Sequence, residues 1–237
     1  MIDRSRCVVL VPFHHYIEPL CDQGLRGLER LGYRVERIGG GAAIDRVRSQ
    51  LATKALDDEK VEELLWIDAD VGFEPADVDK LRAHELPLVG GVYARRGAPG
   101  FSSSMPKGTP ELTFGVAGGL VEARHLATGF LLTHRRVYED VARVFDLPRC
   151  NETFNTPAVP YFLPMVIRDE EHGFWYLSED WSFSERARRA GYKPMIDTSI
   201  RLWHIGTYRY GWEDAATTVA RHPSVVIRVD KTKKSES

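Results

Sequence analysis

The stretch LLWIDADVGFEP, residues 64–75, decides how the rest of the chain is interpreted. Its first part, residues 64–67, is a short apolar run typical of a buried β-strand, and two carboxylates, Asp68 and Asp70, follow directly. Side chains alternate along an extended segment, so Asp68 and Asp70 are predicted to converge beyond the end of this strand. Pro75 suits the first position of a helix, where its missing N–H costs no hydrogen bond.

Strand-like and helix-like segments alternate on both sides of this stretch. The predicted strands cover 7–11, 33–38, 64–67, 86–93, 129–133, 173–177 and one or two segments of 192–205, and the predicted helices cover 17–31, 43–56, a short segment from 75, 135–145 and 179–190. This alternation predicts an α/β fold, a mostly parallel sheet flanked by helices in a single domain. Residues 97–112 and the proline-rich stretch 148–164 are predicted to be irregular.

The composition narrows the class of protein. The 237 residues are 43% hydrophobic and 28% charged, which is ordinary for a globular enzyme, and the net charge of −2 gives no reason to expect nucleic acid as a partner. Three distant cysteines without a CxxC pair argue against disulfides and zinc, and they predict a reducing, cytoplasmic location. No apolar stretch is long enough to cross a bilayer, so no transmembrane segment is expected, while contact with the inner membrane surface is left open.

The paired aspartates suggest a metal. Ligands of open α/β sheets bind at the carboxyl ends of the strands, where Asp68 and Asp70 are expected. Two adjacent carboxylates repel each other, so each resists ionisation unless a cation lies close by. Mg²⁺ and Mn²⁺ take oxygen ligands and often share them with substrate phosphates. The alternative is that both residues only cap the turn or the helix that begins at Pro75.

A second acidic pair opens the helix predicted over 179–190. One interpretation is that Glu179 and Asp180 only complement the helix dipole at this position and have no further function. They also lie on the side of the inward-facing Phe183, where a carboxylate could act as general base toward an acceptor hydroxyl. Trp181 lies off the core stripe and is predicted to stack against a sugar ring.

His204 and Arg48 each have two interpretations. His204 shares a predicted strand face with Ile200 and Leu202, and it is either a buried, hydrogen-bonded histidine or a metal ligand that favours Mn²⁺ over Mg²⁺. Arg48 lies on the apolar stripe of the helix over 43–56. It either extends to solvent or reaches into the cleft to bind a diphosphate.

Three other features stand apart from the predicted metal site. His14 and His15 have no partner at metal-ligand spacing and are assigned no chemistry, and the glycines at 39–41 are interpreted as a turn. The aromatic residues of 208–212 either close over the site or pack against the fold.

Several segments together resemble a known family. WIDADVGFEP, VGGVYARR (89–96), ATGFLLTHRRVYE (127–139), SEDWSFSERARRAGYK (178–193) and RLWHIG (201–206) occur in this order, and IDRVRSQLA precedes them. Together they resemble a bacterial nucleotide-sugar glycosyltransferase of the GT-A fold, close to the family-2-like group with a DXD motif, over roughly residues 7–212. The resemblance implies a GT-A domain over 1–212, followed by a C-terminal extension, 213–237, that ends in a disordered tail.

The resemblance implies catalytic and metal-binding roles. Asp68 and Asp70 match the DXD pair, in which the second acid binds the metal directly and the first contacts metal-bound water or the ribose. His204 matches a further metal ligand. Asp180, in the pair with Glu179, matches the base of inverting members. The expected cofactor is Mn²⁺ or Mg²⁺.

The resemblance also implies how substrates bind. Pro12 and Phe13 fall where such enzymes hold the nucleobase of a nucleoside-diphosphate sugar donor, and Gly129 falls near the donor sugar. The expected acceptor is a hydroxyl group of a sugar, of a lipid-linked compound or of another molecule. Two departures are that VPFHHYIEP lacks the small-residue loop expected after its proline, and that the chain leaves little room for an acceptor subdomain.

The predicted function is metal-dependent glycosyl transfer, with inversion preferred over retention although the fold allows both. One alternative is a phosphatase of the haloacid dehalogenase type with the first aspartate of the DAD motif as nucleophile. Such enzymes carry this motif on the first strand, whereas two predicted strands precede it here. The other alternative is a sugar-binding module without catalysis, served by the aromatic residues.

Overall fold

The apolar run at the centre of the sequence argument is β3 (Glu63–Ile67), and it lies inside a seven-stranded sheet. The structure is a computed structural model that describes residues 3–41, 43–170, 173–216 and 224–229. The strands of the sheet follow the order β2 (Arg34–Gly39), β1 (Cys7–Phe13), β3, β8 (Phe130–His134), β5 (Leu88–Gly91), β11 (Met195–Asp197) and β7 (Leu120–Glu122).

The direction of the strands places several strand ends at one edge. β1 pairs in parallel with β2 and β3, and β5 pairs in parallel with β11. β8 is antiparallel to both β3 and β5, and β7 is antiparallel to β11. β2, β1, β3, β5 and β11 therefore point the same way, as the prediction of a mostly parallel sheet requires. Phe13 and Asp68 consequently lie at the same edge of the sheet.

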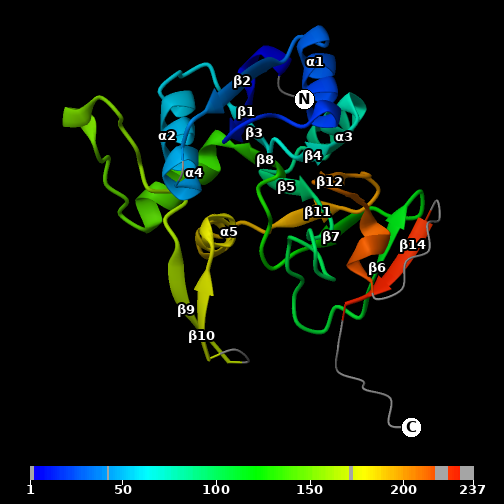
Figure 1. Ribbon diagram of the computed structural model, residues 1–237. Helices are drawn as coiled ribbons and strands as arrows, with labels where there is room; N and C mark the ends of the chain where they lie inside the picture. The colour runs from blue at the N-terminus through cyan, green and yellow to red at the C-terminus, as the bar shows by residue number, and fades with distance from the viewer. Residues whose placement is uncertain (1–2, 42, 171–172, 217–223, 230–237) are drawn as a thin grey trace.

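Helices cover both faces of the sheet, as Figure 1 shows. They are α1 (Pro19–Arg30), α2 (Ile44–Leu56), α3 (Pro75–Ala83), α4 (Arg135–Val144) and α5 (Glu179–Arg189). Alternate residues of β1 enter two separate hydrophobic clusters. Val8 and Leu10 join the cluster that includes α2, α4 and α5, and Val9 and Val11 join the cluster that includes α1 and α3. Because both faces are buried, the strand is apolar throughout.

Shorter elements complete the structure. They are β4 (Val71–Gly72), β6 (Glu111–Gly115), β9 (Met165–Asp169), β10 (Gly173–Leu177), β12 (Trp203–Ile205), β13 (Arg209–Tyr210), β14 (Ser224–Arg228) and the 3₁₀ helices η1 (Arg4–Arg6), η2 (Glu152–Phe154) and η3 (Trp212–Ala215). β9 pairs with β10, β6 with β14, and β12 lies between β13 and β4. The segment predicted over 192–205 is thus two strands in different sheets, β11 and β12.

The chain after residue 212 belongs partly to this fold. The expected boundary falls inside η3, where Glu213 is buried and accepts a hydrogen bond from Arg201 at 2.9 Å. Further along the chain, β14 also joins the fold, because it pairs with β6. The tail 231–237, predicted to be disordered, lies outside the described residues. Among the helices of the described ranges, none is long and apolar enough to cross a membrane.

Candidate active site

A pocket of about 560 Å³ lies at the carboxyl ends of β1 and β3. This is the edge at which open α/β sheets bind ligands. Among the residues that the sequence analysis assigned to a site, the pocket lining includes Pro12, Phe13, Arg48, Asp68, Asp70 and Glu179. Side chains from four separate segments of the sequence therefore meet here.

Arg48 is the central cation of the pocket. Its Nη2 donates a hydrogen bond to Asp68 Oδ1 at 2.7 Å, and its Nε lies 3.6 Å from Glu179 Oε1. Burial of the guanidinium lowers its pKa, but the carboxylates of Asp68 and Glu179 outweigh this, and the pKa of Arg48 is raised. The side chain, 4% exposed, thus reaches into the pocket and does not extend to solvent.

Two donor atoms of this guanidinium are buried without a hydrogen-bond partner in the part of the chain that the structure describes. They are Arg48 Nε and Nη1, and the side chain also lies over the ring of Trp66, with Cζ 5.7 Å from its centroid. A buried donor left unpaired costs about 1–3 kcal/mol, more if it is charged. Donors in this state are suited to an anionic ligand, because such a ligand satisfies the hydrogen bonds and the charge together.

Asp70 and His204 face each other at the rim. Strand pairing of β12 with β4 sets His204 opposite Val71, the neighbour of Asp70. His204 Nδ1 lies 2.9 Å from the carbonyl oxygen of Ala94, which can only accept, so Nδ1 carries the proton of this bond. His204 Nε2 lies 3.6 Å from Asp70 Oδ2.

His204 Nε2 therefore faces a carboxylate oxygen across a short gap. A proton or a metal ion between the nitrogen and the oxygen would bridge the two groups. Burial raises the pKa of Asp70, but His204 and the cation of Arg96 outweigh it, and the pKa of Asp70 lies below its ordinary value. Asp70 therefore presents a carboxylate oxygen beside an imidazole nitrogen, two ligand types that could hold Mn²⁺ together.

Asp68 fits a metal less directly than Asp70. Its Oδ1 already accepts the hydrogen bond from Arg48. Over the described ranges, no group of three or more His, Cys, Asp or Glu side chains is arranged to hold a metal ion. A metal at Asp70 and His204 would therefore need ligands from a substrate, which is common for Mg²⁺ bound with phosphates.

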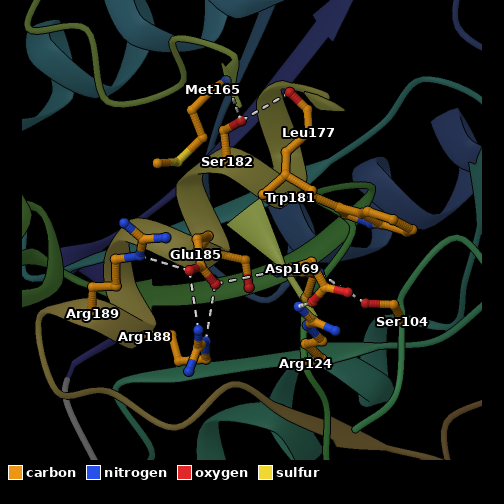
Figure 2. Close-up of polar contacts among 12 residues, drawn as sticks. Ser104, Arg124, Met165, Asp169, Leu177, Trp181, Ser182, Glu185, Arg188 and Arg189 are labelled. Carbon is orange, nitrogen blue, oxygen red and sulfur yellow. Dashed lines mark hydrogen bonds and ion pairs between the residues drawn. The ribbon is translucent and has the colours of Figure 1, made fainter. Parts of the chain in front are cut away.

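Glu179 and Asp180 begin α5, whose first turn is anchored to the hairpin of β9 and β10. Ser182 Oγ accepts a hydrogen bond from Met165 N–H at 3.0 Å and donates one to Leu177 O at 3.0 Å, as Figure 2 shows. Asp180 Oδ1 accepts hydrogen bonds from the Ser178 hydroxyl and, at 2.7 Å, from Trp181 N–H. The first turn of α5 is therefore held by hydrogen bonds of Ser182 to β9 and β10 and by hydrogen bonds to the carboxylate of Asp180.

Both carboxyl groups of this turn are harder to ionise than usual. Burial raises the pKa of Asp180 against the opposing hydrogen bond from Ser178. Burial and then the charge of Asp180 raise the pKa of Glu179. Glu179 lines the pocket, whereas Asp180, one residue further along the same turn, does not belong to the lining. A carboxyl group with a raised pKa beside a pocket is suited to proton transfer.

Trp181 lies outside the pocket lining. Its indole N–H donates to Ser102 O at 2.8 Å, and its ring stacks on His125 with centroids 5.4 Å apart and planes 20° apart. His125 in turn contacts Glu185 of α5 at 3.3 Å. Trp181 thus ties α5 to the neighbouring loop, and its role in acceptor binding stays a prediction.

Gly129 lies directly beside Asp68, near the pocket. Asp68 N–H donates to Gly129 O at 3.0 Å, and Gly129 N–H donates to the Tyr93 hydroxyl at 3.1 Å. A Cβ atom at position 129 would lie 2.2 Å from Tyr93 Oη and 3.0 Å from Asp68 Oδ2. Only glycine therefore fits here without displacing one of these side chains.

Replacing Gly129 with alanine is expected to lower the free energy of unfolding by about 1–3 kcal/mol, because the buried Tyr93 must move. Urea denaturation measures the change. Gly119→Ala is the matched control, since a Cβ at position 119 meets nothing within 4 Å. A Gly129→Ala variant as stable as this control would show that the site adjusts without cost.

The pocket also contains residues that received no role from the sequence. The lining includes His14, His15, Tyr16, Glu18 and Arg96. His14 Nδ1 lies 2.8 Å from His15 Nε2. Their position in the sequence was the available signal, because these histidines follow the carboxyl end of β1 just as Asp68 follows β3.

In the aromatic segment 208–212, Trp212 is buried against Phe114, with ring centroids 5.0 Å apart, so it packs in the core.

Comparisons with known proteins find a likeness in fold to solved structures. No protein-family model matches the chain, and no curated protein matches it in sequence. A197 from STIV has 17% identity and a TM-score of 0.58, over 92% of this chain and 98% of that chain. This likeness concerns the fold alone.

Two further solved structures are more distant. One is a glycosyltransferase involved in the glycosylation of the major capsid of PBCV-1, with 14% identity and a TM-score of 0.33 over 56% of this chain and 62% of that chain. The other is TarS of S. aureus, with 13% identity and a TM-score of 0.40 over 87% of this chain and 36% of that chain. Both TM-scores are too low to support an argument. The fold and the pocket themselves define an α/β protein with acids and arginines at the carboxyl ends of its parallel strands.

Proposed function

We propose that the protein is a metal-dependent glycosyltransferase that moves a sugar from a nucleoside-diphosphate sugar to a hydroxyl acceptor. The observation that carries the proposal is Arg48, a lining residue of the pocket whose buried guanidinium has two nitrogen atoms without a hydrogen-bond partner among the described residues. The facing pair of Asp70 and His204 lies at the same pocket edge. A site for an anion beside a site for a cation suits a diphosphate with its metal, and the order of the sequence motifs supports the same class.

The donor is proposed to lie along the pocket. Pro12 and Phe13 hold the nucleobase. The Phe13 ring packs against Gly39, where a Cβ atom would lie only 2.7 Å from Phe13 Cζ, so a larger residue at position 39 would displace the ring. Arg48 binds the diphosphate through its guanidinium. Asp70 and His204 would hold Mn²⁺ or Mg²⁺, and Asp68 would contact metal-bound water or the ribose. The chemistry that the bound metal supplies is neutralisation of the charge on the leaving diphosphate.

Proton transfer is assigned to α5. The acceptor hydroxyl gives its proton to the carboxylate of Asp180, and its oxygen forms a bond to the anomeric carbon. The bond from that carbon to the diphosphate breaks, and the electron pair leaves with the nucleoside diphosphate. Attack from the opposite face inverts the anomeric centre. Glu179 stays next to Arg48 and balances its charge, and Trp181 contacts the acceptor.

A thermal-shift screen tests the donor and metal sites. UDP, GDP, ADP, CDP and dTDP are added with and without Mn²⁺, and one of them is expected to stabilise the protein markedly more when Mn²⁺ is present. A ligand at 100 times its Kd stabilises the folded state by about 2.7 kcal/mol. Asp70→Asn is expected to remove the dependence on Mn²⁺.

The outcomes separate the alternatives. No shift with any diphosphate would contradict the proposal. Phosphate release from simple esters would indicate the phosphatase instead. The sugar-binding module would be indicated by Mn²⁺-dependent donor binding together with two negative results. These are no hydrolysis of the nucleotide sugar and no transfer of its sugar to any of a broad panel of acceptors.

A further inference from the structure

Arg96 makes a contact that the proposed chemistry does not use. Its Nη1 lies 3.1 Å from Asp70 Oδ2 and donates a hydrogen bond to the carbonyl oxygen of Ile205 at 3.2 Å. The same carboxylate oxygen lies 3.6 Å from His204 Nε2. One oxygen of Asp70 is thus the meeting point of an arginine and a histidine.

We propose that Arg96 is an exchangeable cation: its guanidinium neutralises Asp70 until a metal ion takes that place, and it then binds the diphosphate of the donor. The inference rests on the proposed function, because it needs the metal at Asp70 and the diphosphate in the pocket. It adds a residue that controls the order of binding.

The two arginines of the pocket differ in how firmly they are held. Arg48 is 4% exposed and pairs with Asp68, so moving it would leave buried charge unpaired. The Arg96 side chain is 49% exposed. Ion pairs of exposed side chains are weak, because water replaces them at little cost. Arg96 is therefore the arginine that a competing cation can displace.

Competition follows from electrostatics. A divalent ion at Asp70 and a guanidinium on the same carboxylate oxygen repel each other, so the two cations exclude one another. The exposed part of Arg96 faces solvent, so its guanidinium can leave Asp70 without moving through packed side chains.

The diphosphate offers the displaced guanidinium a new partner. Arg96 and Arg48 both line the pocket, so an anion between them can contact both. A guanidinium binds phosphate oxygens through two parallel hydrogen bonds, which a carbonyl such as Ile205 O cannot match. The metal and the donor would thus bind cooperatively, because the arginine that the first releases is used by the second.

The test compares two affinities in wild type, Arg96→Ala and Arg96→Lys. Electron paramagnetic resonance of free Mn²⁺ measures binding of the metal alone. Calorimetry at saturating Mn²⁺ measures binding of the nucleoside diphosphate that gives the largest Mn²⁺-dependent thermal shift. Arg96→Ala is expected to bind Mn²⁺ alone about two- to five-fold more tightly. It is expected to bind the diphosphate about tenfold more weakly. Arg96→Lys, which keeps the charge, is expected to lie between.

The opposite directions of the two changes exclude simple structural damage, which would weaken both. Arg143→Ala is the matched control, since it removes an exposed arginine of α4 that pairs with Asp140 and lies outside the pocket lining. It is expected to change neither affinity.

Two results would overturn the inference in distinguishable ways. If wild type binds Mn²⁺ and Arg96→Ala binds it no more tightly, Arg96 does not compete and the proposed function still stands. If neither wild type nor any Arg96 variant binds Mn²⁺, the metal site of the proposed function is wrong as well.

Discussion

Replacing Asp180 with asparagine is expected to lower the rate of sugar transfer by about 10²- to 10⁴-fold, because general base catalysis contributes that much. Donor binding is expected to remain within about twofold, since Asp180 does not belong to the pocket lining. The asparagine oxygen can still accept the hydrogen bonds from Ser178 and Trp181 that hold Oδ1. Single-turnover rates and calorimetric titration with the donor diphosphate measure the two quantities.

The pH dependence gives this prediction a second readout. A base must be ionised to accept a proton, so transfer is expected to rise with pH through the raised pKa of Asp180. The variant is expected to lack this limb. Glu179→Gln is the control on the same turn, and its transfer rate is expected to keep the limb. Unchanged turnover in Asp180→Asn would remove Asp180 as the base.

Stability separates loss of the base from unfolding. Because burial raises the pKa of Asp180, the folded state binds this proton more tightly than the unfolded state. The carboxyl group therefore costs stability as pH rises from its unfolded pKa through its raised folded pKa, and the full cost remains at higher pH. Asp180→Asn avoids that cost and is expected to be at least as stable as wild type at neutral pH.

Replacing Arg48 with methionine is expected to lower the free energy of unfolding by about 3–5 kcal/mol, because removing one partner of a buried ion pair leaves uncompensated charge. The carboxylates left behind are those of Asp68 and Glu179, with side chains 27% and 17% exposed. Their partial exposure places the expected loss near the lower value. Urea denaturation at neutral pH measures it.

The loss from Arg48→Met is expected to shrink as pH falls. Burial raises the pKa of Glu179 and the charge of Arg48 lowers it, so without the guanidinium this pKa rises further, and protonation of Glu179 removes part of the unpaired charge. Arg48→Lys keeps a charge and is expected to lose less. Arg26→Ala, at a side chain 68% exposed, is expected to change stability by less than about 1 kcal/mol. A neutral-pH loss in Arg48→Met no larger than in Arg26→Ala would show that Arg48 does not compensate these acids.

Elements whose stability depends on local pattern were predictable from the sequence. The helices that became α2, α4 and α5 end within a residue or two of their predicted limits, because their apolar stripes repeat with the helical period. The strand before Asp68 was predictable because burial on both faces demands a continuous apolar run. The direction of β8 was not, because an apolar run has the same pattern in either direction.

Elements that depend on distant partners were missed. β6 pairs with β14, and β9 was not expected although its partner β10 was. Short strands gain their stability from cross-strand contacts, so their own residues carry a weak signal. The same limit explains why His14 and His15 received no role. Nothing in their spacing shows that they line a pocket with residues from other segments.

By itself, the sequence determined an α/β protein with two aspartates at the end of a buried strand, because strand burial and the alternation of side chains are local properties. Only the tertiary structure decided what these aspartates contact. The pairing of β12 with β4 brings His204 to Asp70, and the packing of α2 turns Arg48 toward Asp68 instead of solvent. The physical reason is that an apolar stripe specifies which helix face is buried, whereas the partner of a charged side chain at its border depends on segments far away in the chain.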